Sequence, residues 1–188
     1  MKIFILDNYD SFTYNLVHIL EQFVEKVVVK RNDETNISEI ENYDKLVFSP
    51  GPGLPSDVCI MNQIIDTYKE TKSILGVCLG HQAIAEYFGA LLLNMVEVNH
   101  GREFETSIVN NDYLFRDIPK TFHSGRYHSW IVDQNNFPEE LTITSVDIST
   151  NHIMSLKHNN FDIRGVQFHP ESIMTKHGKK MLENWVKH

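Results

Sequence analysis

The sequence predicts an α/β domain with a mostly parallel central sheet flanked by helices, and two observations support this. In the first half, short unbroken apolar runs alternate with stretches whose apolar residues recur at helical spacing, a pattern typical of strand–helix–strand units. In the second half, β-like segments follow one another and are expected to add antiparallel strands. At 188 residues the chain has the size of one domain, predicted to span 1–188.

The first half is predicted to contain four strands, each closed by a polar or glycine-containing segment. They cover residues 3–6, 27–29, 46–48 and 74–77. Unbroken apolar runs of this kind are typical of strands that are buried on both faces. Ser11 is placed to cap a first helix, whose apolar stripe runs from Phe12 to Phe23. Further helices are expected over 60–68 and over 82–88, where Gly89 ends the pattern.

After Ala90 the pattern changes to short β-like segments separated by turns. They cover residues 103–109, 141–146, 153–157 and 163–168. The chain ends with a predicted helix near 177–187, which places four apolar residues on one face: Met181, Leu182, Trp185 and Val186.

Composition and charge exclude several classes of protein. The chain has 17 Lys and Arg against 25 Asp and Glu, a net charge of −8, and no basic run. We therefore expect no nucleic-acid partner and no anionic membrane surface. No apolar stretch approaches the roughly 18 residues of a membrane span. Two cysteines exclude a disulfide framework, and the short apolar run before Asp7 does not suit a signal peptide, so a cytoplasmic location is predicted.

Cys78 lies between a predicted buried strand and a predicted helix, with Gly76 and Gly80 two residues to either side. Glycines at these positions relieve the crowding of a sharp strand-to-helix turn, the arrangement of a nucleophile elbow with cysteine in place of serine. A thiol at a helix N-terminus faces the positive end of the helix dipole, which favours the thiolate. The alternative is a small buried cysteine whose glycines serve helix packing. Cys59, which has no such turn, is expected to be a core residue.

His169 and Glu171 are the predicted base and its orienting carboxylate. Pro170 disfavours helix at His169, and in an extended segment residues two apart point the same way. The carboxylate would then hold the imidazole in one tautomer and stabilise its charged form. The alternative is a surface turn with ordinary polar residues. His81, one helical turn after Cys78, lacks the paired Cys and His clusters of a zinc site, so no metal is expected.

The loop Pro50–Gly53 is predicted to be rigid and to present the amides of Gly51 and Gly53 to a substrate oxygen. The alternative is an ordinary tight turn. It lacks the Gly-Lys-Ser/Thr ending of a nucleotide P-loop, and its prolines remove backbone donors. In open α/β sheets, sites form beyond the carboxyl ends of the strands. The loop, the segment Asp7–Ser11 and the segment Cys78–Gln82 are all expected at that edge.

Together these motifs resemble the class I (triad) glutamine amidotransferases, over the whole chain. The signs of the family are Pro50–Gly53, Gly76–Gln82 and Phe168–Glu171, in this order. Within the family the chain looks like the glutaminase component of anthranilate synthase and of aminodeoxychorismate synthase. The motifs that carry this closer similarity are Asp7–Leu16, Arg126–Ser129, and Glu171–Thr175 with Gly178.

The resemblance implies a flavodoxin-like fold and a role for each matching residue. Cys78 would attack the side-chain amide of L-glutamine, His169 would move the protons, and Glu171 would orient His169. The backbone N–H groups of Gly51 and Leu79 are implied as the oxyanion hole. The other implied glutamine-contacting residues are Pro52, Gly53, Gln82 and the backbone of Ser129 and Trp130.

The resemblance also implies a hetero-oligomer with a chorismate-using synthase subunit (component I), which receives the ammonia and carries the Mg²⁺; no cofactor is expected in this chain. Asp7–Tyr14 and Asn99–Arg102 are candidate contacts with that subunit. Because the motifs occupy the chain from Asp7 to Gly178, the ammonia-using domain is expected on a second polypeptide. Trp130 and Arg102 depart from the leucine and lysine common in relatives, and arginine and lysine are not interchangeable at a bidentate partner contact.

Alternative functions stay open at this point. The synthase subunit is expected to make anthranilate, because the sequences of Gly125–Trp130 and Glu183–Trp185 look like that branch of the family. Aminodeoxychorismate is the alternative product. A free-standing Cys-His amidase or peptidase would not need the loop Pro50–Gly53 or the segment Asp7–Ser11. A non-catalytic regulatory subunit would not need an intact set of Cys78, His169 and Glu171.

Overall fold

The computed structural model of the chain describes residues 1–95 and 101–188. Its main feature is a nine-stranded sheet with the order β2-β1-β3-β4-β11-β10-β9-β6-β7. The first five strands in this order are parallel to one another. They are β2 (Lys26–Arg31), β1 (Lys2–Asp7), β3 (Lys45–Phe48), β4 (Ser73–Val77) and β11 (Ile163–Val166). This order is the flavodoxin-like one, and it confirms the predicted parallel core.

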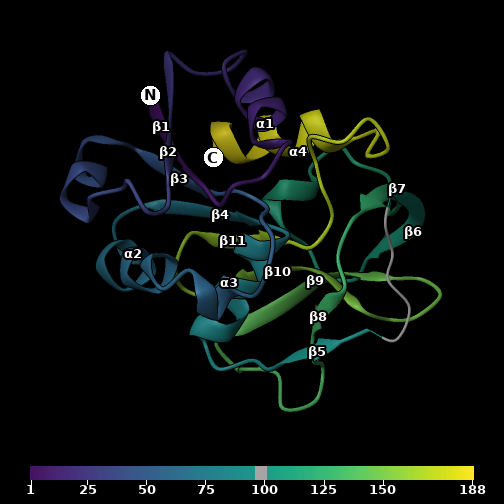
Figure 1. Cartoon of the computed structure of the whole chain (residues 1–188). Coiled ribbons are helices and arrows are strands. Elements are labelled where there is room, and N and C mark those ends of the chain that lie inside the picture. Colours follow the sequence, from purple (N-terminus) through teal and green to yellow (C-terminus); the bar gives the residue numbers. More distant parts are fainter. Residues whose placement is uncertain (96–100) are drawn as a thin grey trace.

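Helices cover both faces of the parallel strands (Figure 1). α1 (Thr13–Leu20) and α4 (Gly178–Lys187) pack together on one face, while α2 (Ile60–Tyr68) and α3 (Leu79–Tyr87) pack together on the other. Because each apolar strand is covered on both sides, the core divides into two clusters, one under each helix pair. The predicted apolar face of the last helix is confirmed, since its four apolar side chains are buried and Trp185 is fully enclosed.

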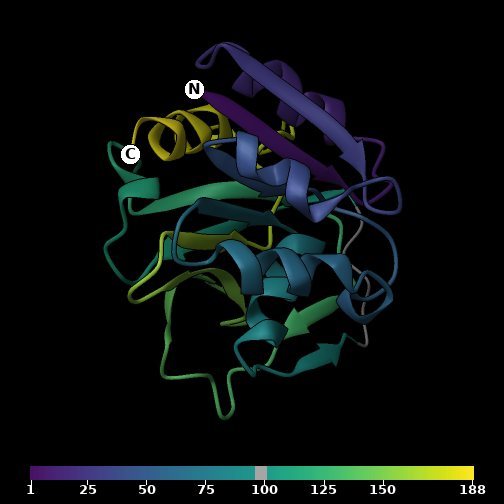
Figure 2. The ribbon, with the colours of Figure 1, turned by 90° about the vertical axis from the view of Figure 1, so that its left-hand side faces the viewer.

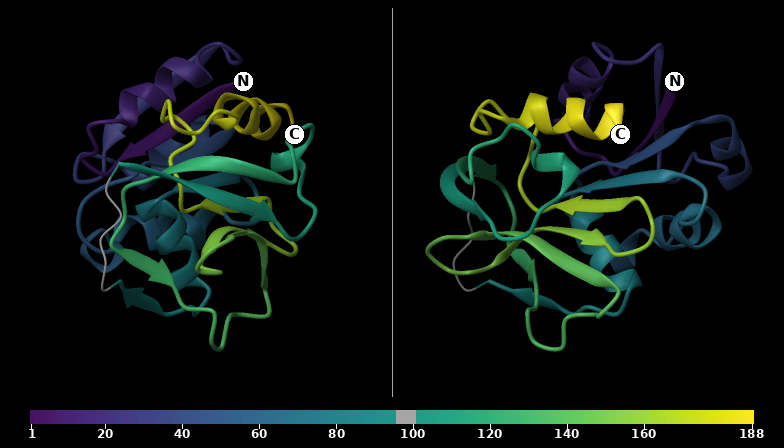
Figure 3. Two further views of the ribbon diagram at one scale, coloured as in Figure 1. Left: turned by 90° about the vertical axis from the view of Figure 1, so that its right-hand side faces the viewer. Right: turned by 180° about the vertical axis from the view of Figure 1, so that it is seen from behind.

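The second half of the chain extends the sheet with antiparallel strands, which form the edge opposite β2 (Figures 2 and 3). The added strands are β10 (Ile153–His158), β9 (Leu141–Asp147), β6 (Arg102–Ile108) and β7 (Thr121–Arg126). A separate two-stranded ribbon pairs β5 (Leu92–Asn94) with β8 (Trp130–Val132). Short 3₁₀ turns complete the described secondary structure: η1 (Ile37–Asn42), η2 (Pro55–Asp57) and η3 (Tyr113–Phe115).

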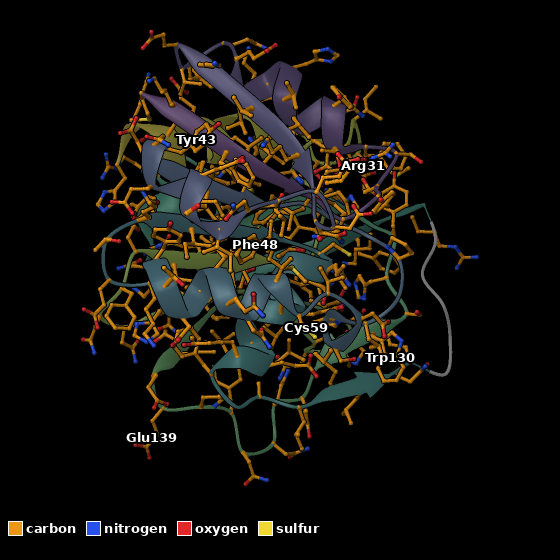
Figure 4. All side chains as sticks on the ribbon, turned by 60° about the vertical axis from the view of Figure 1, so that its left-hand side comes forward. Arg31, Tyr43, Phe48, Cys59, Trp130 and Glu139 are labelled. Carbon is orange, nitrogen blue, oxygen red and sulfur yellow. The ribbon has the colours of Figure 1, made fainter. Side chains whose placement is uncertain are left out.

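Two local predictions are wrong. Ser11 does not cap α1, which starts after Phe12 without any side-chain cap; the Asp10 carboxylate accepts the Phe12 N–H at 2.8 Å instead. Cys59 is exposed and not a core residue, because it precedes the first turn of α2, before the apolar face of that helix begins (Figure 4). Its thiol donates to the Ser56 carbonyl at 3.5 Å. Among the described helices, none is long and apolar enough to cross a membrane.

Candidate active site

The loops that follow β1, β3, β4 and β11 meet at the carboxyl edge of the parallel sheet, where they border a cavity of about 580 Å³. This volume is in the range of small-molecule sites. Asn8 ties two of these loops together, because its backbone N–H donates to Ser49 Oγ at 2.8 Å and its side-chain amide donates to the Ser49 carbonyl at 3.0 Å. The segment between β7 and β8 closes the remaining side of the cavity.

Cys78 forms the predicted elbow between β4 and α3. It is the residue before the first turn of α3 and has φ 52° and ψ −98°, a sparsely populated conformation for a residue with a side chain. A Cβ atom on Gly76 would lie 2.4 Å from the Gly80 carbonyl, and a Cβ on Gly80 would lie 2.6 Å from the Phe48 backbone. The two glycines therefore let the turn close tightly and hold the thiol at the helix N-terminus.

His169 and Glu171 lie side by side, as predicted, although the backbone is not extended. Beyond β11 the chain turns, and the Ser172 N–H donates to the His169 carbonyl at 3.2 Å. The turn brings His169 Nδ1 to 2.6 Å from Glu171 Oε1, and both side chains are almost fully enclosed. Glu171 is therefore placed to keep a proton on Nδ1, which turns Nε2 away from the carboxylate.

The surroundings of His169 favour its charged form. Burial opposes a charged imidazole, but the neighbouring Cys78 sulfur and the Glu171 carboxylate outweigh it and raise the pKa of His169 well above its usual value. Nε2 has no hydrogen-bond partner among the described residues. A cysteine and a histidine that favours its charged form, together in one cavity, are the groups that nucleophilic catalysis by cysteine requires.

Backbone N–H groups are available beside the sulfur. Leu79 is the first residue of α3, so its N–H has no carbonyl one turn earlier within the helix. The Gly51 N–H donates to no described residue. Gly51 also packs so closely on Asn8 that a Cβ atom would lie 2.5 Å from the Asn8 carbonyl oxygen. Both amides border the cavity and can receive a developing oxyanion.

The segment between β7 and β8 is held by partly buried hydrogen bonds. The Trp130 carbonyl accepts from Gln82 Nε2 at 2.9 Å and faces His128 Nδ1 at 3.0 Å. Burial lowers the pKa of His128 to about 3, so the neutral ring donates from Nδ1 to that carbonyl. The Ser129 carbonyl accepts from the Met95 N–H at 2.8 Å. The Trp130 carbonyl oxygen thus accepts two hydrogen bonds. The Ser129 carbonyl oxygen accepts one, so its second lone pair can accept a hydrogen bond from a ligand.

The structure brings every residue of the predicted site together. Glu171 lies behind His169, and the other predicted residues border the cavity: Gly51, Pro52, Gly53, Cys78, Leu79, Gln82, Ser129, Trp130 and His169. Part of the candidate contact Asn99–Arg102 lies outside the described residues.

Several residues that the sequence analysis did not include among the catalytic or glutamine-contacting residues also belong to the site. Phe12 and Tyr127 place their rings 6.4 and 4.8 Å from the His169 ring, and burial raises the pKa of the cavity-lining Asp10. Gln167 is buried beside Cys78. Its signal in the sequence was a polar residue inside an apolar strand-like run, where a polar side chain needs a buried partner.

A larger hollow of about 820 Å³ lies elsewhere, around η3 and the end of α4. It is bordered by none of the predicted site residues, and the cysteines, Cys59 and Cys78, are both absent from its wall. The described residues hold no group of three or more His, Cys, Asp or Glu side chains that would suit a metal ion. The candidate nucleophile Cys78 and the candidate base His169 both line the smaller cavity and not the larger hollow.

Comparison with known proteins agrees with this geometry. The model of the family "Glutamine amidotransferase class-I" matches residues 4–188. Anthranilate synthase component 2 of Pyropia yezoensis is 44% identical, over 99% of both chains. Aminodeoxychorismate/anthranilate synthase component 2 of Bacillus subtilis is 43% identical, over 98% of this chain and 95% of that protein.

Among solved structures, one from Thermoplasma acidophilum, described as a GMP synthase subunit, superposes with a TM-score of 0.89 at 25% identity, over 100% of this chain and 92% of that chain. The fold and the curated relatives point to the same family as the cysteine elbow and its histidine. The chain belongs to the class I glutamine amidotransferases.

Proposed function

We propose that this chain is a glutaminase subunit that hydrolyses L-glutamine and delivers the ammonia to a chorismate-using synthase subunit. One observation carries the proposal: Cys78, at a strained strand-to-helix turn, shares a cavity with the buried His169–Glu171 pair. The backbone N–H groups of Gly51 and Leu79 border the same cavity, so a nucleophile, a base and oxyanion donors are available to one small substrate.

In the first half of the reaction, the Cys78 thiolate attacks the side-chain carbonyl carbon of glutamine. The carbonyl oxygen becomes an oxyanion, which the N–H groups of Gly51 and Leu79 stabilise; one such donor contributes about 10²–10³-fold in rate. The His169 imidazolium then gives its Nε2 proton to the amide nitrogen. The C–N bond breaks, ammonia leaves, and a glutamyl thioester remains on Cys78.

In the second half, neutral His169 removes a proton from water, and the oxygen attacks the thioester carbonyl. The C–S bond breaks, glutamate leaves, and the thiolate and imidazolium are restored, so one glutamine and one water give one glutamate and one ammonia. Glu171 keeps the other ring proton on Nδ1 throughout and stabilises the imidazolium.

The names of the relatives support anthranilate as the product and a component I synthase as the partner. The Bacillus subtilis relative is named for both aminodeoxychorismate and anthranilate synthesis, so aminodeoxychorismate is the alternative product. We infer a hetero-oligomer in the cytoplasm whose Mg²⁺ is held by the synthase subunit. Tyr9 and Phe12, which border the cavity, and the nearby Tyr14 in α1 are exposed apolar side chains that supply a surface for that subunit to cover.

The proposal is tested with the variant Cys78→Ala in complex with a component I subunit. Glutamine-dependent synthesis is expected to disappear, because no thioester can form, while synthesis from added ammonium salt continues at the rate of the unmodified complex. Product analysis with an anthranilate synthase and an aminodeoxychorismate synthase component I identifies which product the chain serves.

Cys59→Ala is the matched control, since it removes the exposed cysteine and is expected to preserve both activities. Equal loss of the glutamine-dependent and ammonia-dependent activities in Cys78→Ala would show that the chain does not act as an ammonia donor.

A further inference from the structure

Gln167 contacts the candidate nucleophile but takes part in none of the steps above. Its side chain is fully buried, and its Nε2 lies 3.6 Å from Cys78 Sγ, a distance at which an N–H donates to sulfur. The Gln167 backbone N–H donates to the Met154 carbonyl at 2.8 Å, so β10 fixes its position. A polar side chain enclosed at this depth requires partners, and sulfur is one of them.

The surrounding hydrogen bonds decide which end of the Gln167 amide faces the sulfur. The Trp130 carbonyl can only accept, so Gln82 must direct its Nε2 toward it, at 2.9 Å. The same Nε2 lies 3.1 Å from Gln167 Oε1, which accepts its second hydrogen. The Gln167 amide is thereby held with its oxygen toward Gln82 and its NH₂ group toward Cys78.

We propose that Gln167 is a further catalytic residue, whose Nε2–H donates to the Cys78 sulfur and stabilises the thiolate. This inference rests on the proposed function, in which the sulfur carries negative charge before attack and again as it leaves the thioester. A hydrogen bond to a charged acceptor is about twice as strong as one between neutral groups. Because the amide is neutral, it supports the thiolate without adding a second cation beside the His169 imidazolium.

The test is the pH dependence of alkylation by iodoacetamide in the full chain and in Gln167→Met, with each cysteine followed separately by mass spectrometry. In the variant, the midpoint for Cys78 is expected to move to higher pH. At neutral pH this lowers its alkylation rate about 10-fold, the size expected for a lost hydrogen bond to a charged atom. The limiting rate at high pH, where every thiol is ionised, should be unchanged.

Two controls separate this effect from a change of structure. The exposed Cys59 reports on the same molecule and should keep its own alkylation profile. Gln63→Met places the same substitution on the exposed face of α2 and should leave the Cys78 midpoint in place. Loosened packing around Gln167 would instead raise the limiting rate at high pH without moving the midpoint, and would overturn the inference.

Gln167→Glu provides a second variant, because it preserves an acceptor for Gln82 while it removes the donor toward Cys78. Once ionised, its carboxylate opposes the thiolate, so the Cys78 midpoint should move further than in Gln167→Met. Midpoints that stay in place in both variants overturn the inference. A shifted midpoint in a chain that hydrolyses no glutamine, alone or with component I, overturns the proposed function instead.

Discussion

At the scale of single residues, the orientation of the His169 imidazole follows from contacts with several neighbours. Its Nδ1 is bonded to Glu171, and its ring meets the edge of Tyr127 with the ring centres 4.8 Å apart. Its backbone carbonyl accepts the Thr175 hydroxyl at 2.6 Å. A ring held in this way keeps Nε2 in one direction, so little reorganisation is needed when a proton moves.

Glu171→Gln is expected to lower the pKa of His169, because the Glu171 carboxylate is one of the groups that raise it. The fraction of imidazolium at neutral pH then falls, and with it the supply of protons for the leaving ammonia. We expect kcat for glutamine hydrolysis to fall about 10²-fold or more. NMR titration of the His169 ring measures the pKa directly.

The exposed Glu139→Gln serves as the control for loss of a carboxylate and should leave both quantities unchanged. An unchanged His169 titration in Glu171→Gln would mean that Glu171 has no influence on the charge of the ring.

At the scale of elements, the elbow depends on how closely α3 approaches the sheet. Gly76 on β4 faces the Gly80 carbonyl on α3, and Gly80 in turn faces the backbone of Phe48 on β3. Side chains at these positions would push the helix away from the strands. The helix N-terminus would then move away from the cavity together with the Leu79 amide, so the two glycines connect the packing of α3 to the geometry of the site.

Gly76→Ala is expected to destabilise the chain by about 3 kcal/mol, because its new Cβ would meet backbone atoms that cannot rotate away. Gly89→Ala is the matched comparison: its Cβ would enter open space, and only the positive φ of 98° would cost stability, about 1 kcal/mol. Urea unfolding of the three proteins measures both changes. Equal losses in the two variants would show that the close approach at Gly76 is unimportant.

β1, β3 and β4 were predictable because burial on both faces leaves an apolar run in the sequence. β11 was expected among the antiparallel strands of the second half, but it pairs parallel with β4. β7 was missed, since its sequence Thr-Phe-His-Ser-Gly-Arg places polar side chains that find buried partners only in the folded chain, such as Ser124 with Thr106 at 2.8 Å. The contact between His169 and Glu171 was predicted for an extended segment and arises from a turn. Hydrogen bonds between distant segments, such as the one from Gln82 to Gln167, produce no periodic pattern in the sequence, so they could not be predicted from it.

At the scale of the whole molecule, the site joins the two halves of the sheet. Cys78 comes from the parallel half, while the segment between β7 and β8 comes from the antiparallel extension. The His169 N–H donates to the Gly125 carbonyl at 3.1 Å, which fastens the end of β11 to β7. The junction also encloses the ion pair between Arg126 and Asp147 and the side chain of His128, so polar groups are buried at the point where the halves meet.

Buried neutral histidines make the folded chain sensitive to acid. Burial lowers the pKa of His128 to about 3 and that of His81 to about 4. Below a pH of about 6.5 the unfolded chain therefore binds protons that the folded chain does not, and stability falls as the pH falls toward the folded values. His169 acts in the opposite sense: its pKa is raised, so its contribution is present at low pH and is lost as the pH rises through the folded value.

His128→Asn should remove one of these acid-sensitive groups. Between about pH 6.5 and pH 5, the free energy of unfolding is expected to fall in both proteins. The fall should be smaller in the variant, by roughly 1.5 kcal/mol, because one fewer histidine takes up a proton on unfolding. Urea unfolding at each pH measures the difference. His18→Gln, which removes an exposed imidazole, is the matched control. If the two variants lose stability in parallel with the unmodified chain, His128 is not held neutral by the fold.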